Sequence, residues 1–168
     1  MRQAGVTLIE LMIVVLIIGL IAMAASPFTS VWVKDARTAE AAAAMEQAVG
    51  KAKSLAMRNA TRVTGDAPAA MLCLSAAKTQ VNLVVPTGPG VTLTCDLAPV
   101  WSTGIAEIVS VKTLGASDIA TDWTCSCFTN KGLPTKTGPN CSTCSASLRF
   151  RFSHDAHSGD EGDTRNFF

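Results

Sequence analysis

The residues best suited to chemistry in this 168-residue chain are six cysteines, all of them beyond residue 70. An even set of cysteines in an exported domain predicts a framework of disulfide bonds. Among the pairings that are possible, we favour Cys73 with Cys95, and we expect the other four to close the loop 128–140 in nested fashion. A bond between Cys73 and Cys95 requires Cα atoms within about 7 Å, which predicts that they lie on adjacent strands. The remaining candidates are Cys125, Cys127, Cys141 and Cys144.

The spacing of these four cysteines also leaves a metal site open. Cys125 and Cys127 form a Cys-x-Cys pair, and Cys141 and Cys144 form a Cys-x2-Cys pair at a distance close to that of a zinc ribbon. The alternative function is therefore a cysteine-rich metal-binding domain, anchored or secreted behind an ordinary signal peptide. Disulfides are much commoner outside the cytoplasm, so we favour the disulfide framework.

Other kinds of chemistry have little material in this sequence. There are two histidines and no tyrosine, and the chain has no Gly-x-Ser-x-Gly, His-Glu-x-x-His or phosphate-binding glycine motif. The net charge of +1 excludes a strongly basic nucleic-acid module, and 48% hydrophobic against 16% charged residues excludes a disordered chain. We therefore expect a folded protein that is not an enzyme and has no cofactor.

The most apolar segment of the chain has an acidic residue directly before it. Residues 11–25 carry no charge, and Glu10 precedes them. About 20 apolar residues span a bilayer as a helix, and a carboxylate inside such a helix costs roughly 2.5–3.5 kcal/mol. A cleaved signal peptide would fit the small residues Ala22 and Ala24, but the single cation Arg2 and the position of Glu10 disfavour it. Glu10 therefore needs a partner.

The stretch from Gly5 to Val15, GVTLIELMIVV, resembles the amino terminus of type IV pilins and of the pseudopilins of type II secretion. In that family a prepilin peptidase cuts after the glycine and methylates the new terminal amine. The resemblance implies that residues 1–5 are a leader and that Val6 becomes the amino terminus. Glu10 is then the fifth mature residue, where the family keeps a glutamate, and Pro27 is the twenty-second, where it often has proline.

The resemblance also implies how Glu10 obtains its partner. The amine freed at Val6 is a cation, and the Glu10 carboxylate of one subunit could pair with the amine of its neighbour in a filament. Burying both charges as a pair avoids leaving either one alone among apolar helices. The alternative is that Glu10 only reaches the lipid headgroups. The implied partners are other pilin or pseudopilin subunits, the prepilin peptidase, an inner-membrane assembly platform and membrane lipid.

Beyond the assembly helix of residues 6–27, the sequence predicts an amphipathic continuation over residues 28–60. The strong helix formers of residues 36–48 favour one long helix that Pro27 kinks or locally melts. An apolar stripe at helical spacing is predicted to face a sheet, while the charged side chains lie off it. The stripe consists of Ala41, Met45, Ala48, Ala52, Leu55 and Ala56.

Residues 61–168 have the composition of an exported β-rich domain. Alternating residues predict a hairpin of strands 81–85 and 91–95 around the turn 86–90. Further strands are expected at 71–74, 105–112 and 147–152. The fold class is therefore α+β, with a long amino-terminal helix packed on a small antiparallel sheet, as in pilins.

Two other groups of residues are weak candidates for sites. Arg149 and Arg151 share one face of a predicted edge strand and could contact nucleic-acid phosphates, although paired cations on an edge are usually only solubilising, so DNA is not expected as a partner. A carboxyl-terminal group of acids could hold a structural calcium ion, as in some major pseudopilins. These acids are Asp155, Asp160, Glu161 and Asp163.

Within the family, residues 46–74 loosely resemble the H-type minor pseudopilins and the FimT-type minor pilins, in which a helix end rich in Ala and Arg precedes a strand carrying a cysteine. The sequence thus predicts a structural subunit, minor rather than major, of a type II secretion pseudopilus or a type IV pilus. The expected location is the inner membrane, crossed once, with the carboxyl-terminal domain in the periplasm or in an extracytoplasmic filament. The sequence does not choose between the two systems.

Overall fold

The computed structural model describes residues 7–88, 90–115, 117–154 and 163–167, with side chains of residues 24–30 left out. It contains one helix and nine strands in these residues. The helix is α1, Leu8–Arg58. The strands are β1 Pro68–Leu74, β2 Gln80–Val84, β3 Trp101–Gly104, β4 Val109–Leu114, β5 Ala120–Asp122, β6 Cys125–Thr129, β7 Pro134–Thr135, β8 Arg149–His154 and β9 Asp163–Asn166.

Both ends of α1 are capped by residues that suit the position. At the start, the backbone N–H of Glu10 donates to Thr7 Oγ1 over 3.4 Å. At the end, Asn59 has a positive φ of 43°. The Asn59 amide closes the following turn, because its Nδ2 donates to the Val63 carbonyl over 2.8 Å and its Oδ1 accepts from the Val63 N–H over 2.7 Å. Asparagine is one of the few residues that tolerates this left-handed conformation at a helix end.

The helix is continuous through Pro27. Of the two predicted effects of this proline, a kink or local melting, the melting is therefore wrong. Proline removes one backbone donor, and the turns on either side remain helical. The chain divides into two compact units, Met1–Ala36 and Arg37–Phe168, so the boundary lies later in the helix than Pro27 and the second part of α1 belongs to the β domain.

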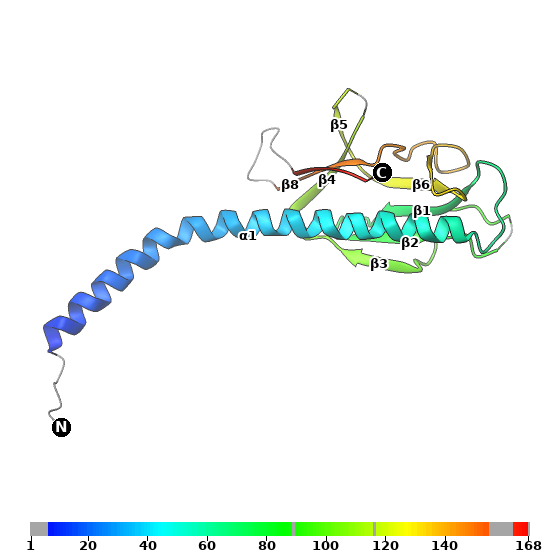
Figure 1. The fold of residues 1–168 in the computed structure, drawn as a ribbon. Coiled ribbons are helices and arrows are strands. Elements are labelled where there is room, and N and C mark those ends of the chain that lie inside the picture. Colours follow the sequence, from blue (N-terminus) through cyan, green and yellow to red (C-terminus); the bar gives the residue numbers. More distant parts are fainter. Residues whose placement is uncertain (1–6, 89, 116, 155–162, 168) are drawn as a thin grey trace. The chain divides into compact units, whose positions relative to one another are not determined.

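In the second unit, α1 buries the predicted stripe. Ala41, Met45, Ala48, Ala52 and Ala56 are at most 1% exposed, and they share one hydrophobic core with side chains of both sheets. Figure 1 shows this part of the helix lying along β1 and β2. The alanines of the helix pack against larger sheet residues, such as Leu72 and Leu83, which fill the space between the helix and the sheet.

The strands form two antiparallel sheets rather than one small sheet. The five-stranded sheet has the order β3-β2-β1-β6-β7, and the four-stranded sheet has the order β5-β4-β8-β9. Trp123 lies at one of the points where the chain passes from one sheet to the other, between β5 and β6. Its N–H donates to Val111 of β4 over 3.2 Å, and the next carbonyl, of Thr124, accepts from Leu74 of β1 over 2.8 Å.

Trp123 is also the centre of the aromatic part of the core. The residue is 1% exposed, and its ring meets that of Phe150 edge-on, with centroids 5.7 Å apart. Its indole N–H donates to Ser126 Oγ over 3.0 Å. Phe167, after β9, lies 5.6 Å from Phe150 between ring centroids. A buried tryptophan therefore packs its ring and satisfies its donor at the junction of the sheets.

The predicted hairpin is wrong in its second strand. Residues 91–95 form no strand, and β2 pairs with β3 instead, with Leu83 opposite Trp101. Both edges of β2 are thus occupied, by β1 and β3. The segment 91–95 instead lies against the outer face of the sheet, where Leu93 is 2% exposed. Of the alternating residues in this segment only Leu93 is buried, whereas Val91 and Cys95 are exposed.

The other predicted strands exist with shifted limits, and several short strands were not predicted. The strand expected at 105–112 begins only at Val109, and the strand expected at 147–152 runs from Arg149 to His154. The latter lies between β4 and β9, so it is an interior strand and not an edge. The strands that the sequence did not predict are β3, β5, β6, β7 and β9.

We predict that Phe150→Ala will destabilise the chain by about 3–5 kcal/mol, because it removes a fully buried ring that contacts three other aromatic residues. Urea unfolding of the purified chain in detergent, followed by tryptophan fluorescence, measures the loss. The control is Ile119→Ala, since Ile119 is 67% exposed and its removal is expected to change stability little. Equal stability of both variants would contradict the packing described.

Candidate functional site

The first candidate site is the apolar beginning of α1. From Leu8 to Met23 every described large apolar side chain is exposed, from 48% for Ile17 to 80% for Met23. These side chains occupy consecutive positions and so cover the whole circumference of the helix. A helix that is apolar on all sides is normally surrounded by other apolar groups. This segment is therefore a surface that a lipid phase or other helices would cover.

Glu10 lies in the first turn of this segment and is exposed. Thr7 and Glu10 are three residues apart, which is the spacing of a capping box. One of the two hydrogen bonds of that motif is present, because the Thr7 hydroxyl accepts from the backbone N–H of Glu10. A carboxylate in the first turn is also favoured by the partial positive charge at the helix start. Glu10 is thus held at the helix end by local interactions, with its carboxylate accessible to a partner.

The other residues of the predicted processing site are not described. Gly5 and Val6 lie outside the described residues, as does the side chain of Pro27. Among the residues that the structure describes, no helix is both long and apolar enough to cross a membrane.

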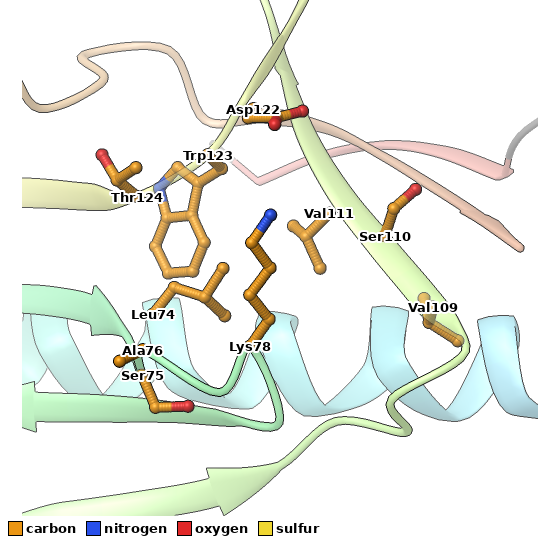
Figure 2. Close-up of a pocket in the computed structure, with 10 residues that line it drawn as sticks. All are labelled: Leu74, Ser75, Ala76, Lys78, Val109, Ser110, Val111, Asp122, Trp123 and Thr124. Carbon is orange, nitrogen blue, oxygen red and sulfur yellow. The ribbon is translucent and has the colours of Figure 1, made fainter.

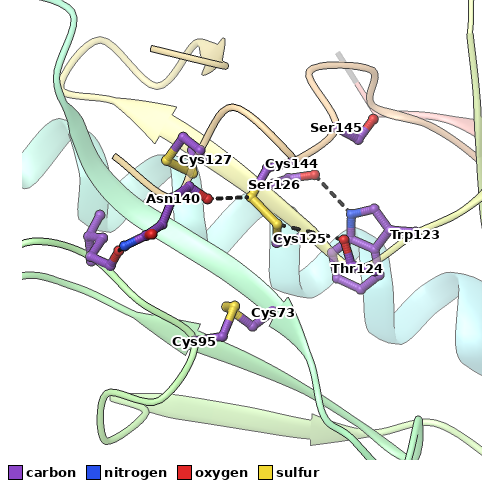
Figure 3. The surroundings of a disulfide bond; sticks show 12 residues. Cys73, Cys95, Trp123, Thr124, Cys125, Ser126, Cys127, Asn140, Cys144 and Ser145 are labelled. Atoms are coloured by element: carbon purple, nitrogen blue, oxygen red, sulfur yellow. Dashed lines mark hydrogen bonds between the residues drawn. A yellow bond between two sulfur atoms is a disulfide. The ribbon is translucent and has the colours of Figure 1, made fainter. Parts of the chain in front are cut away.

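The second candidate site is the cluster of cysteines on the outer face of the five-stranded sheet. The structure has the bonds Cys73–Cys95, Cys125–Cys144 and Cys127–Cys141, with Cα atoms 5.6, 4.8 and 5.9 Å apart. This is the pairing favoured from the sequence, with two nested bonds around the loop 128–140. Figure 3 shows Cys125 and Cys127 on the same strand and Cys73 on its neighbour.

One detail of the cysteine prediction is wrong. Cys73 is on β1, but Cys95 lies in an irregular segment and not on an adjacent strand. The bond therefore ties the segment after β2 across the outer face of the sheet. Asn140 links this segment to the loop of the nested bonds, because its Nδ2 donates to the Leu93 carbonyl over 3.1 Å. Two loops are thus fastened to one sheet face.

The cysteines build a second, small core. It lies on the face of the sheet opposite α1 and combines Met71, Val84 and Leu93 with buried sulfur atoms. The strands β1, β2 and β6 therefore have both faces covered, one by α1 and the other by the loops. Since all the cysteines are in disulfides, they offer no thiolate ligands, and the zinc alternative loses its ligand set.

The three disulfides differ in exposure. Cys125 and Cys144 are 6% and 1% exposed, and Cys127 and Cys141 are fully buried. Cys73 is 1% exposed, but its partner Cys95 is exposed. A thiolate must reach a sulfur atom to reduce a disulfide, so the Cys73–Cys95 bond is the accessible one.

A partly open cavity of about 290 Å³ lies between residues of both sheets. Figure 2 shows its apolar wall of Leu74, Val111 and Trp123, with Lys78 extending from the turn after β1 toward the side of the cavity that holds Asp122. Lys78 has a positive φ of 55°. The lining offers one ammonium, one carboxylate and hydroxyl groups, with no histidine and no thiol among them.

The two arginines predicted as a weak phosphate site already have protein partners. Arg149 pairs with Asp118 over 2.7 Å and donates to Asn166 over 3.2 Å. Arg151 is half-buried on the same interior strand, where its neighbours Phe150 and Phe152 point to the core. The paired cations are thus not on an edge strand as predicted, and Arg149 serves to fasten β8 to its surroundings.

Of the acidic residues predicted as a weak calcium site, only Asp163 is described. It begins β9 and accepts two hydrogen bonds from Arg165, at 2.9 and 3.0 Å, to its Oδ2. This hydrogen bonding and the charge of Asp163 raise the pKa of Arg165. Asp155, Asp160 and Glu161 lie outside the described residues. Among described residues, no group of three or more metal-ligating side chains comes together.

Comparison with known proteins gives one match, at the amino terminus. Residues 1–26 match the family model of the prokaryotic N-terminal methylation motif. The chain therefore begins as type IV pilin-like precursors do, and the match includes Gly5, Val6 and Glu10. Neither the curated proteins nor the solved structures gave a significant match.

We predict that mild reduction of the folded chain will open the Cys73–Cys95 bond well before the other two, because Cys95 is the exposed cysteine. Alkylation after increasing times with dithiothreitol, followed by peptide mass spectrometry, measures the order. Labelling of all six cysteines at the same rate would contradict the buried cluster, and free thiols in the unreduced chain would contradict the disulfides.

Proposed function

We propose that this protein is a minor structural subunit of a filament, either a type II secretion pseudopilus or a type IV pilus. The observation that carries the proposal is the methylation motif of residues 1–26, within which Leu8–Met23 form a helix segment that is apolar on all sides. The motif supplies a site for removal of the leader, and the helix supplies a surface that needs other helices or lipid around it.

In this proposal a prepilin peptidase cuts after Gly5 and methylates the amine of Val6. The mature chain is then located in the inner membrane, which it crosses once, with its β domain on the periplasmic side. The charge-free residues 11–25 support this location. The assembly platform moves the subunit into the filament, where neighbouring helices replace the lipid.

The carboxylate of Glu10 determines the register of this step. It lies at the helix start, where Thr7 caps the backbone and leaves the carboxylate exposed. In an apolar bundle an unpaired carboxylate is costly, so the subunit is stable there only when the amine of a neighbouring Val6 meets it. The charge pair therefore supports one axial position of each subunit rather than a continuous range.

The proposal of a minor subunit, of the H-type or FimT-type, is supported by the order of elements after α1. An Ala-rich helix end is followed by β1, which carries Cys73. The disulfides and the covered sheet faces suit a domain that works outside the cytoplasm, where thiols are oxidised.

We predict that Glu10→Ala will be cleaved normally but will be at least tenfold depleted from filaments sheared off the cell and pelleted. The loss follows from removal of the carboxylate that pairs with the neighbouring amine. Immunoblots of pellet and membrane fractions measure the distribution of the chain.

The matched control is Glu46→Ala, which removes an exposed carboxylate from the same helix but within the β domain. This variant is expected to enter filaments like the unmodified chain. Normal incorporation of Glu10→Ala would show that the charge pair does not govern assembly.

A further inference from the structure

The two sheets have four edge strands in the described part of the chain, and three of them are protected against pairing with another strand. β7 has two residues, one of which is Pro134. β5 has three residues and includes the exposed Asp122. β9 carries Asp163 and Arg165. Short length, proline and charge are the usual means of blocking an edge.

The fourth edge strand, β3, is also short, with four residues, but it has neither a charge nor a proline. Its sequence is Trp-Ser-Thr-Gly, from Trp101 to Gly104. The register places Gly104 opposite Gln80 and Ser102 opposite Asn82. Ile105 N donates directly to the carbonyl of its opposite residue, Thr79, over 2.7 Å. Because hydrogen-bonded pairs alternate along an antiparallel ladder, the backbone groups of Ser102 and Gly104 point away from β2, to the open edge.

A groove of about 630 Å³ runs beside this open edge, between β3 and α1. The helix wall consists of short side chains such as Ala41 and Ala44 together with Gln47, and the strand wall runs from Thr103 to Ala106. At one end Arg37 and Glu40 pair with each other over 2.8 Å, so the charges lining the groove cancel. A neutral groove with a free strand edge fits an uncharged extended segment.

The edge strand is also held in place before any partner arrives. The Trp101 ring lies 4.2 Å below the Lys51 ammonium of α1, measured to its centroid. Val100 N donates to the Leu83 carbonyl over 2.8 Å, and Ile105 N donates to Thr79 at the other end. Both ends of β3 are therefore fixed, which lowers the entropy cost of pairing with a new strand.

We propose that β3 and this groove bind an uncharged, extended segment of a different subunit of the same filament, which adds to the five-stranded sheet as a sixth strand. The inference rests on the proposed function. The helix wall of the groove belongs to α1, the helix whose beginning is proposed to carry assembly. A minor subunit has other subunits as neighbours, and so the occupant is a different chain rather than a second copy.

The experiment uses the full chain in its native membrane, with the photoreactive residue of Gln47→p-benzoylphenylalanine in the groove wall. The control carries the same residue in Ile119→p-benzoylphenylalanine, at an exposed position outside the groove. Mass spectrometry of sheared filaments identifies the cross-linked peptide. We expect an uncharged segment of another filament subunit from the Gln47 position and at least tenfold less of that product from Ile119.

Two pairs of variants test the mode of binding. Ser102→Pro removes a backbone donor that points outward, whereas Ser102→Ala keeps it, so only the proline variant is expected to lose the Gln47 product at least tenfold. Ala44→Glu puts a charge in the groove wall without touching β3, and Ala44→Gln is its neutral control. The second pair keeps the test decisive if the proline variant does not fold.

The inference would be overturned by a Gln47 product that joins two copies of this chain, by the absence of a product, or by full cross-linking of both Ser102→Pro and Ala44→Glu. Its failure is distinguishable from failure of the proposed function. If the unmodified chain is present in sheared filaments while these results occur, only the inference fails. If the unmodified chain is absent from filaments, the proposed function fails as well.

Discussion

The close packing of α1 on the five-stranded sheet is the interaction on which the rest of the β domain depends. The small residues Ala48, Ala52 and Ala56 are fully buried in the core that α1 shares with the strands. Both sheets contribute to this core, through Leu83 on one side and Phe152 on the other. A larger side chain on the stripe would separate the helix from both sheets at once.

The same helix has a second apolar surface that the described part of this chain does not cover. The apolar stripe from Ala41 to Ala56 is narrow and is buried against the β domain, whereas Leu8–Met23 is apolar on every side and exposed. One helix thus joins a folded domain to a segment that requires an apolar environment. Under the proposed function, this division would let the β domain fold before assembly while the first turns of the helix gain stability only when neighbouring helices surround them.

On the opposite face of the five-stranded sheet, the disulfides hold the covering loops in place. The loops that cover this face contain few large apolar residues, and Leu93 is the main one buried there. Three cross-links restrict the unfolded chain and hold these loops in place of a larger core. The exposed Cys95 shows that this cover is least protected at the segment after β2.

Much of this architecture could be predicted from the sequence. Helical spacing identified the buried stripe of α1, and the pairing of the cysteines that was favoured among the possible ones is the pairing in the structure. The second strand of the hairpin could not be predicted, since Leu93 and Cys95 alternate like a strand while making no ladder. The short edge strand β3 has no periodicity within four residues, so only the structure shows the groove beside it.

The candidate functional residues likewise include some that could be predicted from the sequence and some that could not. The spacing of Gly5, Glu10 and Pro27 indicated a pilin-like amino terminus, and the match of residues 1–26 to the methylation motif agrees with it. The environment of Arg149 was not predictable, because its partners Asp118 and Asn166 are distant in sequence. Local motifs are visible in a sequence, whereas contacts that depend on sheet order are not.

The central claim is that this chain is matured as a pilin-like subunit, and the mass of the intact protein from the membrane fraction tests it most directly. The account predicts a chain that begins at Val6 and carries one added methyl group, together with the mass loss of six hydrogens for three disulfides. A chain that begins near Ala25 and is found in the soluble exported fraction would contradict it. The assembly helix would then be a discarded signal, and the β domain would act alone.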